Sequence, residues 1–489
     1  MTSDTAPKTN EMCCSSTDCS YLTELKSFIR DVTKDAVTNS ETEGGGGGAG
    51  VTGNTAVVGN GIGELRTRNN AETYLVKESE ELQAEVLVYV WQKLSSCNCP
   101  DHFRLGLSQL VKNEILSELN NAKVREDLME TSKQINTESQ DAEQLKCFDL
   151  LKLQKFISQQ LDKILLRLSD NSKEDDLKTY ADCQDEKRRK SASSYIPLCT
   201  VMQVKNKPRK MEDRNVCLPR FGELYGLENQ YGFFGVFDGH SGALASTYAA
   251  NQMPYLVAKH LKEFKITACQ TETDFYRDVL EASFLKADAN FAQKSLGSGT
   301  TAVCALLKYN NNISSNSLSA NHLYVAWVGD SRCLLVSPTV SLQLVKAHKP
   351  DSIDERKRIE SIETGGAVVF VHGQWRVNGI INVSRSIGDH SVKAVIAEPD
   401  FVDVPLQASH DFLILGSDGL WDHVPESDVV KCTYKSLADK QQPLENIPKQ
   451  LIELAKKGDS QDNITVMLVL LKDRSNIIEN YTKSVEKST

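Results

Sequence analysis

The chain has 489 residues, of which 56 are Lys or Arg and 66 are Asp or Glu, giving a formal charge of −10. At ~100–200 residues per domain, this length predicts two or three units. The negative charge argues against a general nucleic-acid binder, which needs a basic surface. No segment approaches the ~20 apolar residues of a membrane span, so we expect neither nucleic-acid nor membrane partners.

The chain contains 13 cysteines, scattered along its length, and its first residues are polar with no apolar signal segment. We therefore expect reduced thiols in a protein of the cytoplasm or nucleus. Zinc ligands are not expected, because the neighbouring cysteines have only His102 close by and match no common zinc spacing. These cysteines are Cys13, Cys14, Cys19, Cys97 and Cys99.

The first part of the chain has two zones of different composition. Residues 1–68 are rich in Ser, Thr, Asn and Gly, and they predict a flexible tail. Residues 69–170 carry apolar side chains at helical spacing, such as Leu153, Ile157 and Leu161, and they predict a helical domain. Three roles remain open for these helices: an independent domain, a regulatory arm of a catalytic unit, or a docking platform for a partner.

Residues 171–194 form a charged linker ahead of the main unit. Its basic run 187–190 fits a solvated linker, a nuclear-targeting patch, or a kinase site with Ser191 as acceptor. Residues 195–473 alternate strands with amphipathic helices and predict a second unit, followed by a polar tail over 474–489. Helices are expected at 243–264, 273–294, 351–364 and 446–457.

Acidic residues stand at the ends of several apolar runs in this second unit. The runs 231–237, 323–328 and 412–415 each end beside one, and 463–470 begins after one. If the last run pairs antiparallel with a neighbour, all four acids lie at one edge of a sheet. Carboxylates gathered there repel one another unless cations neutralise them, so the pattern predicts a metal site. Its members are Glu212, Asp238, Asp330, Asp418 and Asp462.

Seven short segments in order resemble the metal-dependent serine/threonine protein phosphatase family, type 2C. They are KMED (210–213), FDGHSG (237–242), SGTTAV (298–303), VGDSR (328–332), SRSIGD (384–389), SDGLWD (417–422) and DNITV (462–466). The resemblance covers roughly residues 195–472. It implies an α+β fold with a central antiparallel β-sandwich flanked by helices, here preceded by the helical N-terminal domain.

The resemblance also implies a role for each matching residue. Two Mg²⁺ or Mn²⁺ ions are expected, bridged by Asp238, with the Gly239 carbonyl, Glu212, Asp418 and Asp462 as further ligands. Asp213 would orient a metal-bound water, and His240 would be the general acid. A third, weaker ion would use Asp330 with Asp418, and Asp422 is a fainter candidate. Asp389 is expected just outside the metal ligands.

The chain departs from the family pattern at the phosphate-binding position. The family usually has an arginine four residues before the motif glutamate, and here that residue is Pro208. Arg209 or Lys210 could grip the phosphate instead. Residues 356–379 correspond to a substrate-facing flap.

Within the family, residues 209–214 and 375–379 are most similar to the calcium/calmodulin-dependent protein kinase phosphatase branch. This branch implies hydrolysis of phosphoserine and phosphothreonine on kinases or other signalling phosphoproteins, with partner docking through the N-terminal helices. There are two alternative functions. One is a pseudophosphatase scaffold, which loss of metal ligands would indicate, and the other is a dinuclear hydrolase of nucleotides or DNA, which would need a basic groove.

Overall fold

Two five-stranded antiparallel sheets form the centre of the computed structural model, which describes residues 24–33, 73–78, 80–130, 147–169, 196–228, 230–266, 269–309, 321–361 and 363–488. The strands of the first sheet run, in spatial order, β16 (Asp400–Pro405), β10 (His322–Val328), β9 (Ala302–Tyr309), β6 (Gln230–Phe237) and β5 (Arg214–Leu218). Those of the second run β12 (Ser341–Gln343), β11 (Arg332–Val336), β17 (Phe412–Gly416), β18 (Ile464–Leu470) and β4 (Cys199–Val204). The expected α+β fold with an antiparallel sandwich is confirmed.

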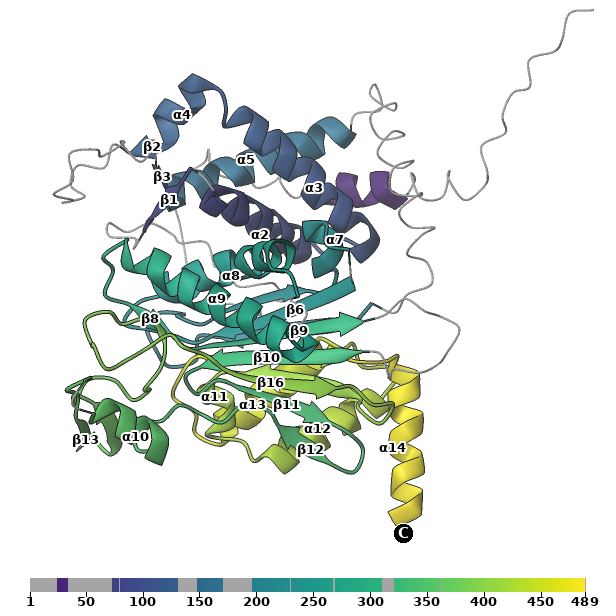
Figure 1. Ribbon diagram of the computed structural model, residues 1–489. Helices are drawn as coiled ribbons and strands as arrows, with labels where there is room; N and C mark the ends of the chain where they lie inside the picture. The colour runs from purple at the N-terminus through teal and green to yellow at the C-terminus, as the bar shows by residue number, and fades with distance from the viewer. Residues whose placement is uncertain are drawn as a thin grey trace, which may run out of the picture.

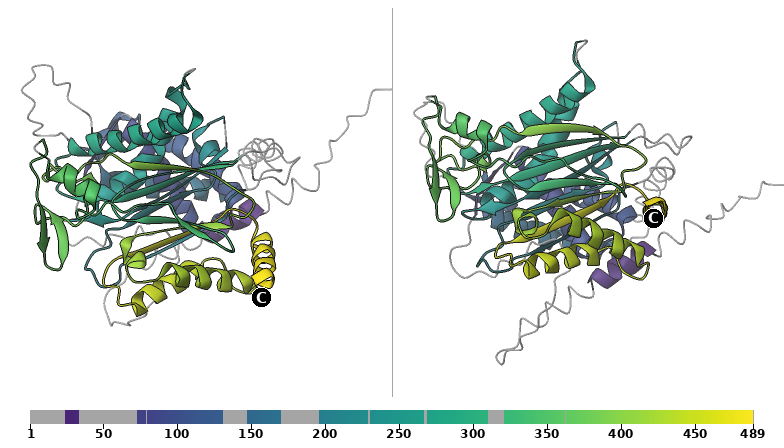
Figure 2. Two further views of the ribbon diagram at one scale, coloured as in Figure 1. Left: turned by 60° about the horizontal axis from the view of Figure 1, so that its bottom comes forward. Right: turned by 90° about the horizontal axis from the view of Figure 1, so that it is seen from below.

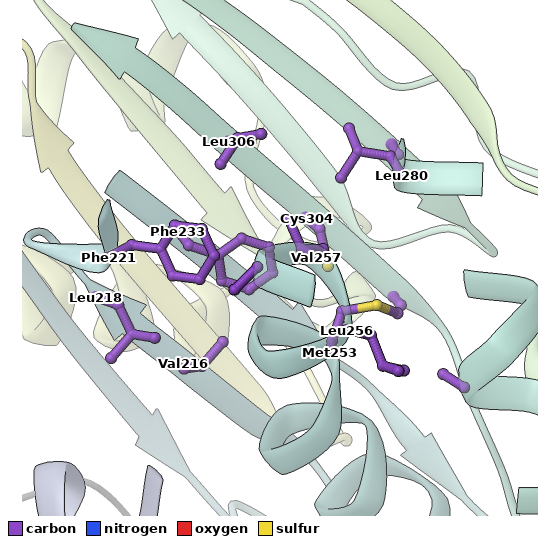
Figure 3. Packing of buried hydrophobic residues seen from close by; sticks show 14 of the residues in the cluster. Val216, Leu218, Phe221, Phe233, Met253, Leu256, Val257, Leu280, Cys304 and Leu306 are labelled. Carbon is purple, nitrogen blue, oxygen red and sulfur yellow. The ribbon is translucent and has the colours of Figure 1, made fainter. Parts of the chain in front are cut away.

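Helices cover both outer faces of the sandwich (Figure 1). Over the first sheet lie α8 (Leu244–Glu263) and α9 (Glu272–Ala292), and over the second lie α11 (Asp418–Trp421), α12 (Glu426–Ala438) and α13 (Asn446–Lys457). Alternation along β6 supplies two of the cores: Phe234 packs between the sheets, whereas Phe233 faces the helices. Figure 3 shows the core that contains Phe233, in which this residue and Leu306 of the first sheet pack with side chains of α8.

The predicted helices correspond to α8, α9, α13 and the short α10 (Ile353–Ile359), but α12 was not anticipated from the sequence. Its buried face includes Thr433 and Ser436, which interrupt the apolar pattern. Each hydroxyl donates to the backbone carbonyl four residues earlier, at 2.8 Å, so the helix satisfies these buried polar groups itself.

The N-terminal part folds into a helical bundle with a small sheet at one end. The helices are residues 24–33, α2 (Glu80–Ser96), α3 (Asp101–Glu118), α4 (Ala122–Leu128) and α5 (Leu150–Ser169), and the strands are β1 (Leu75–Lys77), β3 (Cys147–Asp149) and β2 (Met129–Glu130). Leu25 and Ile29 are fully buried in this bundle. The prediction of a flexible tail is therefore wrong for residues 24–33.

The bundle and the sandwich share their hydrophobic cores: α2 packs against α8 (Figure 1), and the bundle lies against the sandwich in the further views of Figure 2. Tyr248 of α8 belongs to the core of the bundle, while Leu87 and Trp91 of α2 belong to the core between the first sheet and α8 and α9. Trp91 also donates its indole N–H to the Cys217 carbonyl of edge strand β5 at 3.1 Å. The predicted helical domain is thus packed as an integral layer of the protein.

The C-terminal segment also differs from its prediction, because residues expected as a polar tail form α14 (Arg474–Ser488). Ile477 is fully buried, and the Tyr481 ring stacks on Tyr434 with centroids 4.1 Å apart. Some sequence features fall outside the described residues: the glycine run 44–48, the basic run 187–190 with Ser191, and Cys13, Cys14 and Cys19.

Three small elements complete the fold. The hairpin β13 (Val368–Val371) and β14 (Gln374–Val377) lies with α10 at one side of the sandwich (Figure 1). A short helix, α7 (Phe221–Tyr225), follows β5, and a three-stranded sheet joins β15 (Ile387–Gly388), β8 (Gly299–Thr300) and β7 (Gly239–His240). Among the helices described, none combines the length and the apolar character needed to cross a membrane.

Candidate metal centre

The structure brings the predicted acidic residues together at one edge of the sandwich. Asp238 directly follows β6, while Asp330 and Asp418 come two residues after β10 and β17. Asp462 comes two residues before β18, and because Gly416 pairs with Val466 across antiparallel β17 and β18, it lies at the same edge as Asp418. Distant sequence positions are thereby placed side by side, as their position at strand ends predicted.

The electrostatics of the site confirm that these acids lie close to one another. Burial raises the pKa of Asp238 well above its usual value, and the surrounding carboxylates of Asp213, Asp418, Asp330 and Asp462 raise it further. Burial likewise raises the pKa of Asp418, followed by the negative charges of Asp330, Asp462 and Asp422. Carboxylates that repel one another in this way are stabilised when a cation binds beside them.

The acids do not form a closed cage of side chains. Within the described ranges, no three His, Cys, Asp or Glu side chains are arranged as a group that could hold an ion by themselves. All the donors at this edge are oxygens, and Mg²⁺ and Mn²⁺ prefer oxygen ligands and keep several waters. The donor chemistry and the charge therefore fit these ions.

Glu212 and Asp213 reach the site from the loop 205–213 between β4 and β5. The Glu212 backbone N–H donates to Asn463 Oδ1 at 2.7 Å, and the Glu212 carboxylate accepts the Gly242 N–H at 3.0 Å. Asn463 also donates to the carbonyls of Lys205 and Lys210, at 2.8 and 3.1 Å. This residue was missed as a site residue, although its position directly after Asp462 was a signal that could have identified it.

Asp213 is buried behind the other acids, with 1% of its surface exposed. Its carboxylate accepts the hydroxyls of Thr465 at 2.7 Å and Ser417 at 3.0 Å. Burial raises the pKa of Asp213 to about 6, while these two hydrogen bonds act in the opposite direction. The two hydrogen bonds fix the Asp213 carboxylate, and the charge of Asp462 acts on it.

Gly239 is required by close backbone packing rather than by an unusual φ. A Cβ atom at this position would lie 2.4 Å from the Glu212 carbonyl oxygen and 2.7 Å from Ser246 Oγ. Since real Cβ atoms do not approach so closely, only glycine lets the end of β6 meet the loop that carries Glu212. The Gly239 backbone is thereby packed against the loop that carries Glu212.

His240 is paired with Asp389, with Nε2 and Oδ2 2.6 Å apart. The register of the small sheet explains the pairing, because Gly299 lies opposite both His240 and Gly388. A Cβ on Gly299 would lie 2.0 Å from Asp389 Oδ2 and 2.4 Å from His240 Nε2, so its absence opens the space in which they meet. Ser386 Oγ donates to the same Asp389 oxygen at 2.5 Å. Asp389, which was expected just outside the metal ligands, thus contacts the His240 imidazole.

The residues expected at a third ion already have basic partners. Asp330 is 3% exposed and accepts a hydrogen bond from the Lys349 ammonium group. Asp422 forms an ion pair with Arg332, with N and O 3.2 Å apart. A cation at this position would have to displace or share these partners, so the structure favours the third ion less than the other two.

A cavity of about 340 Å³ opens beside Glu212. It is lined by Pro208, Arg209, Lys210, Glu212, Ser241 and Gly242. The Arg209 and Lys210 side chains are exposed, so both can reach an anion that enters this cavity. Pro208 stands where the family usually has an arginine, and the basic side chains of Arg209 and Lys210 follow it directly.

The comparisons with known proteins agree with this geometry. The family model "Protein phosphatase 2C" matches residues 198–464. Human protein phosphatase 1E is 31% identical over 409 residues, 82% of this chain and 47% of that protein. Human protein phosphatase 1F is 36% identical over 295 residues, 59% of this chain and 60% of that protein. The chain therefore spans about half of the first relative and three fifths of the second.

The fold is also shared with a solved structure, described as that of a C. elegans sex determining protein. The two superpose with a TM-score of 0.63 at 22% identity, over 84% of this chain and 91% of that chain. This coverage exceeds the part matched by the family model, so the likeness in fold extends beyond the sandwich. From the matched residues and the acidic edge that they form, the chain belongs to the protein phosphatase 2C family.

Proposed function

We propose that this chain is a protein serine/threonine phosphatase that hydrolyses phosphoserine and phosphothreonine with two bound Mg²⁺ or Mn²⁺ ions. The observation that carries the proposal is the meeting of Asp238, Asp418 and Asp462 at one edge of the sandwich, with their charges unbalanced. The acidic positions of the metal motifs are all present in the sequence: Glu212, Asp238, Asp330, Asp418 and Asp462. A pseudophosphatase scaffold is disfavoured, because the chain keeps every acidic metal ligand of the family motifs.

The proposed ligands are the carboxylates of Glu212, Asp238, Asp418 and Asp462 together with the Gly239 carbonyl. When bound, divalent ions supply the positive charge that lowers the pKa of water and offsets the charge of the phosphoryl group. Asp213 orients the attacking water, because its own carboxylate is fixed by Ser417 and Thr465. The ligands come from strand ends and a tied loop, so they are preorganised for this task.

His240 is the proposed general acid for the leaving serine or threonine oxygen. Asp389 holds the imidazole through Nε2 and so fixes the plane of the ring and the direction of Nδ1. Arg209 and Lys210 attract the substrate phosphate into the cavity beside Glu212. A guanidinium group can bind phosphate in bidentate fashion, so we assign the larger part to Arg209.

The proposed substrates are phosphorylated kinases or other signalling phosphoproteins of the cytoplasm or nucleus. The similarity to protein phosphatases 1E and 1F supports a protein substrate. The hairpin of β13 and β14 is the proposed substrate-facing flap, where the Phe370 ring is 59% exposed and Arg356 lies over the Trp375 ring. Partner docking through the N-terminal bundle remains a proposal alongside it.

A phosphothreonine peptide assay tests this function. Full-length protein should release phosphate with Mg²⁺ or Mn²⁺ and lose this activity in excess chelator. Asp238→Ala should abolish release, whereas Asp127→Ala, on the exposed surface of α4, should leave it unchanged. Release that persists in chelator would contradict the metal-dependent mechanism.

A further inference from the structure

A cysteine pair lies at the base of the loop that carries Glu212 and Asp213. Cys199 is on β4, an edge strand of the second sheet, and Cys217 is on β5, an edge strand of the first. The structure joins their sulfur atoms in a disulfide, with the Cα atoms 7.0 Å apart. The pair therefore connects the two sheets at one edge of the sandwich.

The two cysteines lie on the strands at either end of the loop. Cys199 and Cys217 are 18 positions apart in sequence, and the whole connection 205–213 lies between them. Asn463 ties the middle of the loop, and Asn215 Nδ2 donates to Gln203 Oε1 at 2.8 Å between the same two strands. The bond between Cys199 and Cys217 links the two strands that flank the loop, while Asn463 holds the loop by hydrogen bonds to its backbone.

The cysteines in the central strands of the first sheet and in β11 differ from this pair in burial. Cys304 and Cys333 are fully buried, and burial raises the pKa of each thiol, that of Cys333 to about 12. Thiols of this kind stay protonated and inert, since the thiolate is the reactive form. Cys199 and Cys217 are half-buried at the sandwich edge, where a small oxidant or reductant can reach them.

We propose that Cys199 and Cys217 form a reversible disulfide that clamps the loop bearing the metal and phosphate residues, an inference that rests on the proposed function of that loop. With a peroxide as oxidant, one thiolate attacks an oxygen to give a sulfenic acid and releases water after protonation. The second thiolate then displaces the sulfenic oxygen, which leaves as a second water. A dithiol reductant returns both cysteines to thiols.

Closure of the disulfide should restrict the freedom of the loop, because it links β4 and β5 at the base of the loop. With the disulfide formed, the loop has fewer conformations, so Glu212 loses less conformational entropy when ions bind. We therefore expect the reduced protein to need several-fold more Mn²⁺ for half-maximal activity.

Limited trypsin digestion of the full-length protein tests the clamp without relying on activity. Lys205, Arg209 and Lys210 are exposed cleavage sites within the loop. After peroxide treatment, peptide mapping without reductant should find Cys199 linked to Cys217. Cleavage at these sites should then be at least about fivefold slower than in protein reduced with a phosphine, because local opening of the loop is suppressed.

Two serine variants make the result specific. Cys217→Ser should abolish the difference between oxidised and reduced protein, while Cys269→Ser, at an exposed cysteine elsewhere, should preserve it. Equal cleavage rates with the bond present, or a bond between other cysteines, would overturn the proposal. A trypsin difference in a protein without phosphatase activity in either state would uphold the clamp and refute the proposed function of the loop.

Discussion

Glu85 makes the attachment of the N-terminal bundle sensitive to pH. This residue of α2 is 1% exposed, and burial raises its pKa from 4.5 to about 7, against the effect of hydrogen bonds from Tyr74 and Gln252. The Tyr74 hydroxyl lies 2.5 Å from Oε1, and Asn251 Nδ2 of α8 lies 2.7 Å from Oε2. The carboxylate therefore sits in the contact between the bundle and the sandwich.

The size and sign of the effect follow from these two pKa values. The folded state binds the Glu85 proton more tightly than the unfolded chain, so this stabilisation is complete below pH ~4.5 and is lost as the pH rises through about 7. At about 1.4 kcal/mol per pKa unit, the full difference is roughly 3 kcal/mol. Between pH ~5.5 and ~8, Glu85 should account for about 2 kcal/mol of lost stability.

Urea unfolding of the full-length protein, followed by tryptophan fluorescence in the presence of chelator, measures this loss. Glu85→Gln removes the titration, so the free energy of unfolding of the variant relative to the wild type should rise by about 2 kcal/mol between these pH values. Glu118→Gln, on the exposed face of α3, controls for the loss of one surface carboxylate. A difference between wild type and Glu85→Gln that stays constant with pH would refute the buried, proton-binding role of Glu85.

Three further variants test the proposed site and the shared core. Asp389→Asn should lower kcat by about 10–100-fold with little change in KM or in Mn²⁺ binding, because it disturbs the orientation of His240; loss of Mn²⁺ binding would instead show a structural role. Arg209→Ala should raise KM about tenfold or more at similar kcat, since a charged hydrogen bond contributes about 1.5–3 kcal/mol, and an unchanged KM would assign the phosphate to other residues. A chain beginning at residue 196 should aggregate or unfold without a cooperative transition, because Tyr248 becomes uncovered and the core between the first sheet and α8 loses Leu87 and Trp91; cooperative unfolding at the wild-type midpoint would show that the sandwich is stable alone.

The metal edge could be predicted from sequence because each acid lies within two residues of an apolar run. The strand ends at Asp238, Asp330 and Asp418, and the strand start at Asp462, follow from that pattern alone. The pairing of His240 with Asp389 could not be predicted, since it depends on the register of three two-residue strands across Gly299. Such short strands carry no periodicity from which a register can be inferred.

The organisation of the N-terminal part could be predicted only in outline. Helical spacing in α5 indicated a buried face, but an apolar stripe does not identify the surface that covers it. The helix at residues 24–33 lies within a polar, glycine-rich region, and its burial depends on the contacts of Leu25 and Ile29 with the bundle. Its sequence alone is too short to fold as an isolated helix, so tertiary packing decides its structure.

The most direct test of the metal centre is anomalous diffraction from crystals of the full-length protein grown with Mn²⁺. We expect two strong peaks at the edge of the sandwich, both next to Asp238, one shared with Asp418 and Asp462 and the other with Glu212. Peaks absent from this edge at saturating Mn²⁺, or placed elsewhere on the molecule, would contradict the proposal that these acids hold the catalytic ions.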